Sequence, residues 1–135
     1  AKTRARSIRE GLLFFLEKIA SQKKVWIFGS KRAADYAYLF LRNNGIKNIA
    51  GFFDNDKSRQ GMSKFGLSIV SPEETIEKER SSFFLIASTN YVSDLKGWLE
   101  GHGVSDDQYQ VYGGGGYGQL LHPFICTNIL IKGDG

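Results

Sequence analysis

A glycine turn carrying two cations is the part of the sequence best suited to chemistry. Gly29 follows the apolar run Val25–Phe28, and Ser30, Lys31 and Arg32 come directly after it. Glycine allows a tight turn into a helix, whose N-terminal amides and positive dipole attract phosphate. We therefore predict that Gly29, Ser30, Lys31 and Arg32 bind a phosphate group. The alternative is a strand-to-helix turn that binds no ligand.

A second chemical feature is Asp54, which follows the predicted second strand, 46–53, and lies 25 positions after Gly29. In dinucleotide-binding strand–helix–strand units, an acid at the tip of the second strand accepts the ribose hydroxyls. We expect Asp54 in that role. The alternative is a turn favoured by Asp54 and its neighbours Asn55 and Asp56.

Lys31 departs from the dinucleotide fingerprint G-x-G-x-x-G/A, because it stands where the second glycine is expected. That glycine keeps side chains away from the pyrophosphate of the cofactor. A lysine there either blocks a dinucleotide or meets a phosphate with its ammonium group. The expected ligand is therefore NAD(P) or a nucleotide-sugar, and the fingerprint alone does not select NAD.

Ser88 follows a third apolar run, 82–87, and begins the polar stretch Ser88-Thr89-Asn90. Small polar side chains at the carboxyl end of a parallel strand line the crevice where open α/β sheets bind ligands. We include Ser88 in the predicted binding site, with capping of the next helix as the alternative. His102 and His122 lack the spacing of metal ligands, so no metal site is predicted and catalytic residues stay unassigned.

The elements that would position these residues alternate between strands and helices. Alternation of this kind favours right-handed crossovers and a parallel sheet. We predict an α/β fold: a three-layer Rossmann-like domain with a parallel sheet of four to five strands and an extra N-terminal helix. The predicted strands are residues 25–28, 46–53, 82–87 and 109–112, and a short apolar run, 67–70, lies between the second and third of them.

Capping signals predict where three helices begin. Ser7 and Glu10 form a capping box before an amphipathic helix over residues 7–21. Ser71, followed by a proline and two glutamates, predicts a second helix start. Asn90 or Ser93 is expected to cap a third helix. The polar stretch 54–66, punctuated by glycines, is predicted to be a loop.

Composition restricts the class of protein. With 135 residues, 41% hydrophobic and 24% charged, the chain is predicted to be one globular domain rather than a disordered segment. The single cysteine, Cys126, excludes an internal disulfide framework and a multi-cysteine zinc site, and favours a cytoplasmic setting. No apolar run has the eighteen or so residues that a membrane-spanning helix needs.

The net charge of +4 is concentrated at the N-terminus. Residues 1–24 hold seven bases and two acids, and the remaining chain holds eleven bases and twelve acids. A nucleic-acid-binding surface needs a basic stripe with stacking aromatics on one face. One basic terminal segment does not supply it, so we predict no nucleic-acid partner.

Four segments resemble the Rossmann-like nucleotide-binding domains of bacterial sugar-modifying and polysaccharide-biosynthesis proteins. They are Val25–Gly29, Gly45–Asp56, Val70–Glu74 and Leu85–Ser88. Such domains are joined to nucleotide-sugar dehydratases, sugar O-acyltransferases or FkbM-type methyltransferases. The resemblance covers about half of the chain. It implies a nucleotide, nicotinamide-dinucleotide or nucleotide-sugar site around Gly29, Ser30 and Asp54.

These observations predict three segments: an N-terminal amphipathic helix (1–24), a Rossmann-like nucleotide-binding domain (25–112) and a Gly-rich C-terminal extension (113–135). The expected function is an accessory module that binds a nucleotide or nucleotide-sugar within a larger sugar-modifying protein. A linked catalytic domain or a second copy of the chain is the expected macromolecular partner. The alternatives are a fragment of an NAD(P)-dependent oxidoreductase or sugar-modifying transferase, and a scaffold that binds no ligand.

Overall fold

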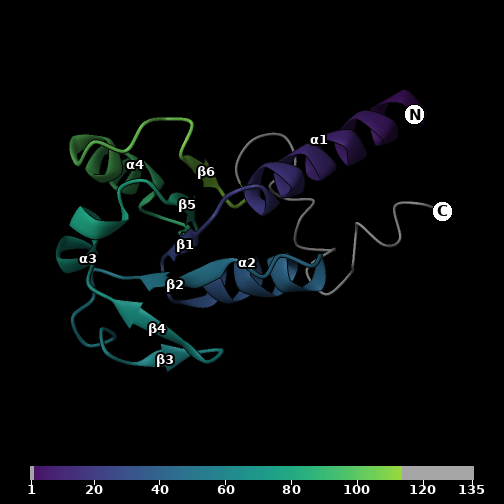
Figure 1. The fold of residues 1–135 in the computed structure, drawn as a ribbon. Helices are drawn as coiled ribbons and strands as arrows, with labels where there is room; N and C mark the ends of the chain where they lie inside the picture. The colour runs from purple at the N-terminus through teal and green to yellow at the C-terminus, as the bar shows by residue number, and fades with distance from the viewer. Residues whose placement is uncertain (1, 114–135) are drawn as a thin grey trace.

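The computed structural model in Figure 1 describes the backbone of residues 2–113 and the side chains of residues 10–113. Six strands form one sheet in the order β3-β4-β2-β1-β5-β6. The strands are β1 (Val25–Phe28), β2 (Ile49–Phe53), β3 (Ser63–Lys64), β4 (Leu67–Val70), β5 (Phe83–Ile86) and β6 (Tyr109–Val111). Apart from Gly113, the predicted C-terminal extension lies outside the described residues.

Five of the six strands run parallel, which confirms the predicted α/β class. The exception is β3, which pairs antiparallel with β4 through Ser63 and Lys64. It falls inside the stretch 54–66 that the sequence predicted to be a loop. The prediction failed there because two residues are too few to show an alternating pattern of apolar and polar side chains.

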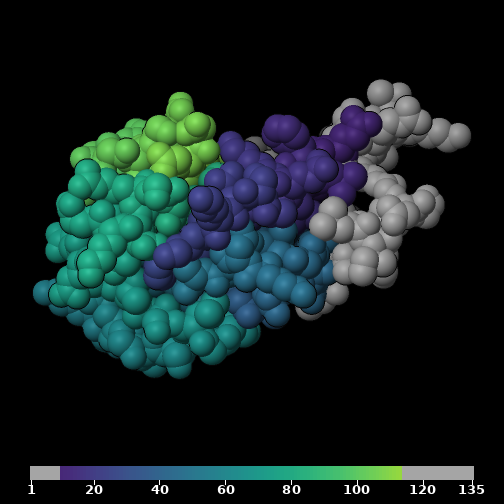
Figure 2. All heavy atoms as spheres, in the orientation of Figure 1, coloured from purple at the N-terminus to yellow at the C-terminus, as the bar shows by residue number. Residues whose placement is uncertain are grey.

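Helices cover both faces of the sheet and give the predicted three layers (Figure 1). The helices are α1 (Lys2–Ala20), α2 (Arg32–Asn43), α3 (Pro72–Glu79) and α4 (Val92–Gly101). Side chains of α1 and α2 belong to one core cluster, and those of α3 and α4 belong to the other. Figure 2 shows α1, in purple, packed beside α2, in blue. No described helix is long and apolar enough to cross a bilayer.

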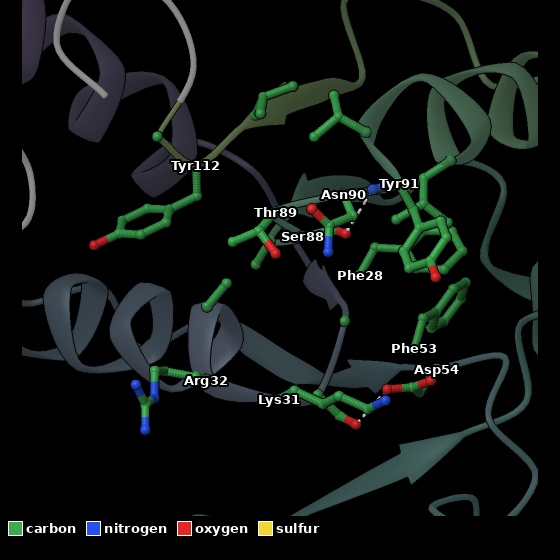
Figure 3. Close-up of a pocket in the computed structure, with 18 of the residues that line it drawn as sticks. Phe28, Lys31, Arg32, Phe53, Asp54, Ser88, Thr89, Asn90, Tyr91 and Tyr112 are labelled. Carbon is green, nitrogen blue, oxygen red and sulfur yellow. Dashed lines mark hydrogen bonds between the residues drawn. The ribbon is translucent and has the colours of Figure 1, made fainter. Parts of the chain in front are cut away.

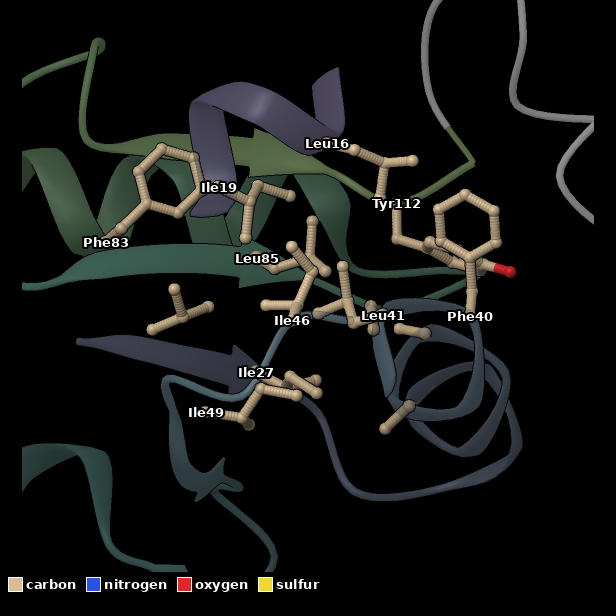
Figure 4. Close-up of a cluster of buried hydrophobic side chains, with 14 of the residues drawn as sticks. Leu16, Ile19, Ile27, Phe40, Leu41, Ile46, Ile49, Phe83, Leu85 and Tyr112 are labelled. Carbon is tan, nitrogen blue, oxygen red and sulfur yellow. The ribbon is translucent and has the colours of Figure 1, made fainter. Parts of the chain in front are cut away.

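The central strand β1 supplies side chains to both cores, because successive residues of a strand point to opposite faces. Val25 and Ile27 join the cluster under α1 and α2, which Figure 4 shows in close-up. Trp26 and Phe28 join the cluster under α3 and α4. All four residues of β1 are buried, so the strand has no polar face. The continuous apolar run in the sequence follows from this position at the centre of the sheet.

Two of the three predicted helix starts are wrong. The capping box of Ser7 and Glu10 lies within α1, which begins at Lys2 because lysine, arginine and alanine in residues 2–6 are good helix formers. The first residue of α4 is preceded by Tyr91 as N-cap, with no side-chain hydrogen bond, so neither Asn90 nor Ser93 caps it. The third start is confirmed: Ser71 Oγ accepts a hydrogen bond from the Glu74 N–H at 3.3 Å.

The parallel strands follow the doubly wound order β4-β2-β1-β5-β6. From β1 the chain builds outward first through β2 and β4, and then from the other side of β1 through β5 and β6. The direction of winding therefore reverses between β1 and β5. In open α/β sheets the crevice outside the carboxyl ends of the strands at such a switch point is where ligands bind.

Candidate functional site

A cleft of about 1210 Å³ opens at this switch point, outside the carboxyl ends of β1, β2, β5 and β6 (Figure 3). Its walls come from the turn after β1, the segment after β2, the segment after β5 and the first turns of α2 and α4. All six residues that the sequence assigned to binding line it: Gly29, Ser30, Lys31, Arg32, Asp54 and Ser88. The topology thus brings together residues that are up to 59 positions apart in the chain.

Gly29 makes the turn after β1, and no other residue fits there. Its φ is +125°, and an added Cβ atom would lie 2.3 Å from the backbone oxygen of Ala87. The Gly29 N–H donates to the Phe53 carbonyl at 2.7 Å. The turn is therefore fixed between the end of β2 and the end of β5, with its backbone close to both.

Helix α2 begins at the cleft with its first amides uncapped. Lys31 is the N-cap residue, in an extended conformation, and no side chain in the described part of the chain caps this helix end by a hydrogen bond. The acid in the first turn, Asp35, is paired with Lys64 Nζ at 2.5 Å. The N–H groups that start a helix have no partner within the helix itself. This end of α2 therefore presents free donors and a partial positive charge to the cleft.

The other helix ends differ from that of α2. Helix α4 also begins at the cleft without a side-chain cap, but Asp94 in its first turn already balances part of its dipole. Helix α3 has the Ser71 cap and two glutamates in its first turn. The start of α2 is consequently the most favourable of the three for an anion.

Lys31 and Arg32 extend in different directions from the start of α2 (Figure 3). The Lys31 ammonium group lies 3.7 Å from Asp56 Oδ2, and its side chain is 68% exposed. Two hydrogen bonds from Ser58 lower the pKa of Asp56, and the charge of Lys31 lowers it further. An ion pair this exposed is weak, so Lys31 is free to turn toward an anion in the cleft.

Ser30 and Asp54 meet below the turn in a polar cluster with Arg59. Ser30 Oγ donates to Asp54 Oδ2 at 2.5 Å and accepts from Arg59 Nε at 2.7 Å. Ser30 is fully buried, so its side chain serves this cluster, and only its backbone is available to the cleft. Arg59 was not among the predicted site residues, because it lies in the predicted loop at no spacing typical of a nucleotide site.

Ser88 and its neighbours form the opposite wall of the cleft. Ser88 Oγ accepts a hydrogen bond from the Tyr91 N–H at 3.1 Å, so it stabilises the turn that leads into α4. Thr89 and Asn90 lie beside it in Figure 3. The cleft continues past these neutral side chains to Tyr112 at the end of β6. Within the described range there is no group of three His, Cys, Asp or Glu side chains arranged to hold a metal ion.

Comparisons with known proteins identify a similar fold at a distance. No protein-family model matches the chain, and no curated protein matches it. Among solved structures, UDP-D-quinovosamine 4-dehydrogenase from Vibrio fischeri is similar, with a TM-score of 0.47 and 22% sequence identity. The match covers 67% of this chain and 76% of that one. The likeness is too distant to indicate a ligand or an activity.

Proposed function

We propose that this protein is an accessory module that binds a nucleotide or nucleotide-sugar in the cleft between β1 and β5. The observation that carries the proposal is the uncapped start of α2, which opens on the cleft directly after Gly29. A helix N-terminus at a topological switch point combines free amide donors, a partial positive charge and a concave site. A phosphate or diphosphate group is the ligand that uses all three.

Charge is distributed unevenly along the cleft, which supports a ligand with two different ends. Lys31 and Arg32 stand at the α2 end. The wall after β5 offers Ser88, Thr89 and Asn90, which are neutral side chains able to donate and accept hydrogen bonds. We therefore place the phosphates at the start of α2 and an uncharged polar group, such as a sugar or a nucleobase, against the wall after β5.

Lys31 is the side chain that the proposal assigns to the phosphate. It replaces the usual second glycine, and among the described residues its ammonium group has only the exposed Asp56 carboxylate as an ion-pair partner. Exchange of that partner for a phosphate would add a charge-assisted hydrogen bond to those from the α2 amides. A dinucleotide that needs close contact with the backbone at this position would meet the lysine side chain instead.

Calorimetric titration of the full chain with UDP, UDP-glucose, NAD and NADP tests the proposal. We expect saturable binding of at least one of these ligands, and a loss of roughly tenfold in affinity for Lys31→Met, since hydrogen bonds to charged groups contribute about 1.5 to 3 kcal/mol. Lys47→Met is the matched control, because Lys47 is exposed on the loop before β2, at the opposite end of the sheet. Absence of binding by all four ligands, or equal losses for the two variants, would contradict the proposal.

A further inference from the structure

The side chain of Ser30 is the centre of a buried connection between the phosphate-facing turn and the segment after β2. It is fully buried, and its hydroxyl group both donates and accepts. The donated bond goes to Asp54 and the accepted bond comes from Arg59. The hydroxyl group is therefore committed to the protein and is not available to a ligand.

Arg59 also binds Ser30 through the backbone carbonyl of Ser30. Its Nη2 donates to the Ser30 carbonyl at 2.8 Å, while its Nε donates to the Ser30 hydroxyl at 2.7 Å. The rigid fork of a guanidinium group thus fixes both the backbone and the side chain of Ser30. This residue lies between Gly29 and the N-cap of α2, so its orientation sets the direction of the amides that start the helix.

The Asp54 carboxylate is committed on both oxygens. Oδ2 accepts from Ser30 and lies 3.9 Å from Arg59 Nε, and Oδ1 accepts from the Asp56 N–H at 2.8 Å. The side chain is only 13% exposed. The acid that the sequence assigned to the ribose hydroxyls is therefore partnered within the protein, and its charge is balanced by Arg59.

We propose that Arg59, Ser30 and Asp54 form a clamp that positions the phosphate-binding turn, and that the site selects its ligand by the phosphates and not by the ribose. The inference rests on the proposed nucleotide site. Asp54 and Arg59 are positioning residues in this scheme. A ligand that lacks a ribose hydroxyl loses no hydrogen bond to Asp54 and binds as well as the complete ribonucleotide.

The wild-type protein tests this with three probes: inorganic pyrophosphate, UDP and 2′-deoxy-UDP. We expect measurable binding of pyrophosphate, and affinities for UDP and its 2′-deoxy analogue within about threefold of each other. A preference of tenfold or more for UDP is the scale of a lost hydrogen bond to a charged acceptor and overturns the clamp. Failure of both UDP and pyrophosphate to bind contradicts the underlying nucleotide site instead.

Two variants separate positioning from general stability. Arg59→Met removes the fork, so we expect at least a fivefold loss of pyrophosphate affinity. We also expect a rise in the ratio of UDP to deoxy-UDP affinity, because Asp54 loses the cation that balances its charge and attracts a further hydrogen-bond donor. A purely structural role for Arg59 would leave that ratio unchanged and overturn the proposal. Arg80→Met is the control, since Arg80 pairs with the exposed Glu77 away from the cleft. If Arg59→Met does not fold, the ratio of UDP to 2′-deoxy-UDP affinity of the wild-type protein decides the question alone.

Discussion

At the scale of single residues, Tyr112 carries a hydroxyl group that the fold buries without a hydrogen-bond partner among the described residues. Its ring packs near Phe40 under α1 and α2. A buried polar group without a partner costs free energy, and its removal recovers that cost. We expect Tyr112→Phe to leave the free energy of unfolding unchanged or raise it by about 1 kcal/mol, as measured by urea denaturation at pH 7.

The same residue makes the free energy of unfolding fall as the pH becomes alkaline. Burial raises the pKa of Tyr112 to about 12, against an ordinary value of 10. Below pH 10 both states keep the proton, and between pH 10 and 12 the unfolded chain ionises first, so the free energy of unfolding falls as pH rises. The loss reaches roughly 2 to 3 kcal/mol for this residue. Tyr112→Phe should therefore decline less steeply, and an equal decline would contradict the argument.

The limits of sequence-based prediction are also visible at this scale. The tight turn at Gly29 was predictable, because a glycine between an apolar run and a helix is suited to such a turn. Arg59 was not, because its bonds to Ser30 span 29 positions and depend on how a long polar segment folds back. Asp54 was placed correctly at the strand tip, but its hydrogen-bond partners could not be deduced from its position.

At the scale of elements, the start of α2 favours binding of an anion and lacks the cap that would stabilise the helix. Lys31 has the extended conformation of an N-cap residue but no side chain that can accept from the helix amides. A serine at this position would cap the helix, so Lys31→Ser should raise the free energy of unfolding by about 1 kcal/mol. The same change removes the cation and occupies an amide, so nucleotide affinity should fall. Denaturation and calorimetry on one preparation measure both effects.

The reverse change on α3 is the control for this trade-off. Ser71 caps α3, and Ser71→Ala should lower the free energy of unfolding by about 1 kcal/mol without any effect on the cleft. A Lys31→Ser protein that is more stable and binds equally well would contradict the role given to Lys31.

The difference between helix starts also explains why one predicted helix start was right and another was wrong. Ser71 has a proline and glutamates behind it, whereas the start of α4 is set by the turn through Ser88.

At the scale of the whole molecule, α1 is part of the core of the sheet. Its residues Leu12, Phe15, Leu16 and Ile19 are buried in the same cluster as β1 and α2 (Figure 4). We expect Leu16→Ala to lower the free energy of unfolding by about 2 to 5 kcal/mol, because it opens a cavity in this cluster. Phe14 is 71% exposed on the same helix, so Phe14→Ala should change the free energy of unfolding by less than about 0.5 kcal/mol.

Urea denaturation of the two α1 variants checks this, and similar values for both would show that α1 does not belong to the cooperative core.

At the scale of the whole molecule, the sequence predicted most of the fold. Buried strands that alternate with amphipathic helices leave few arrangements, so the parallel sheet and three layers were predictable. The antiparallel strand β3 was not, because it consists of two residues, and its pairing depends on the position of β4.

That short strand also affects how the protein behaves at high concentration. An unpaired sheet edge is a template for association with another chain, and proteins guard against it with short or charged edge strands. Here β3 covers the outer side of β4 with only two residues, and one of them is Lys64, held by Asp35. This edge of the sheet is therefore a poor template for pairing with a second chain, and we expect it to resist edge-to-edge association at high concentration.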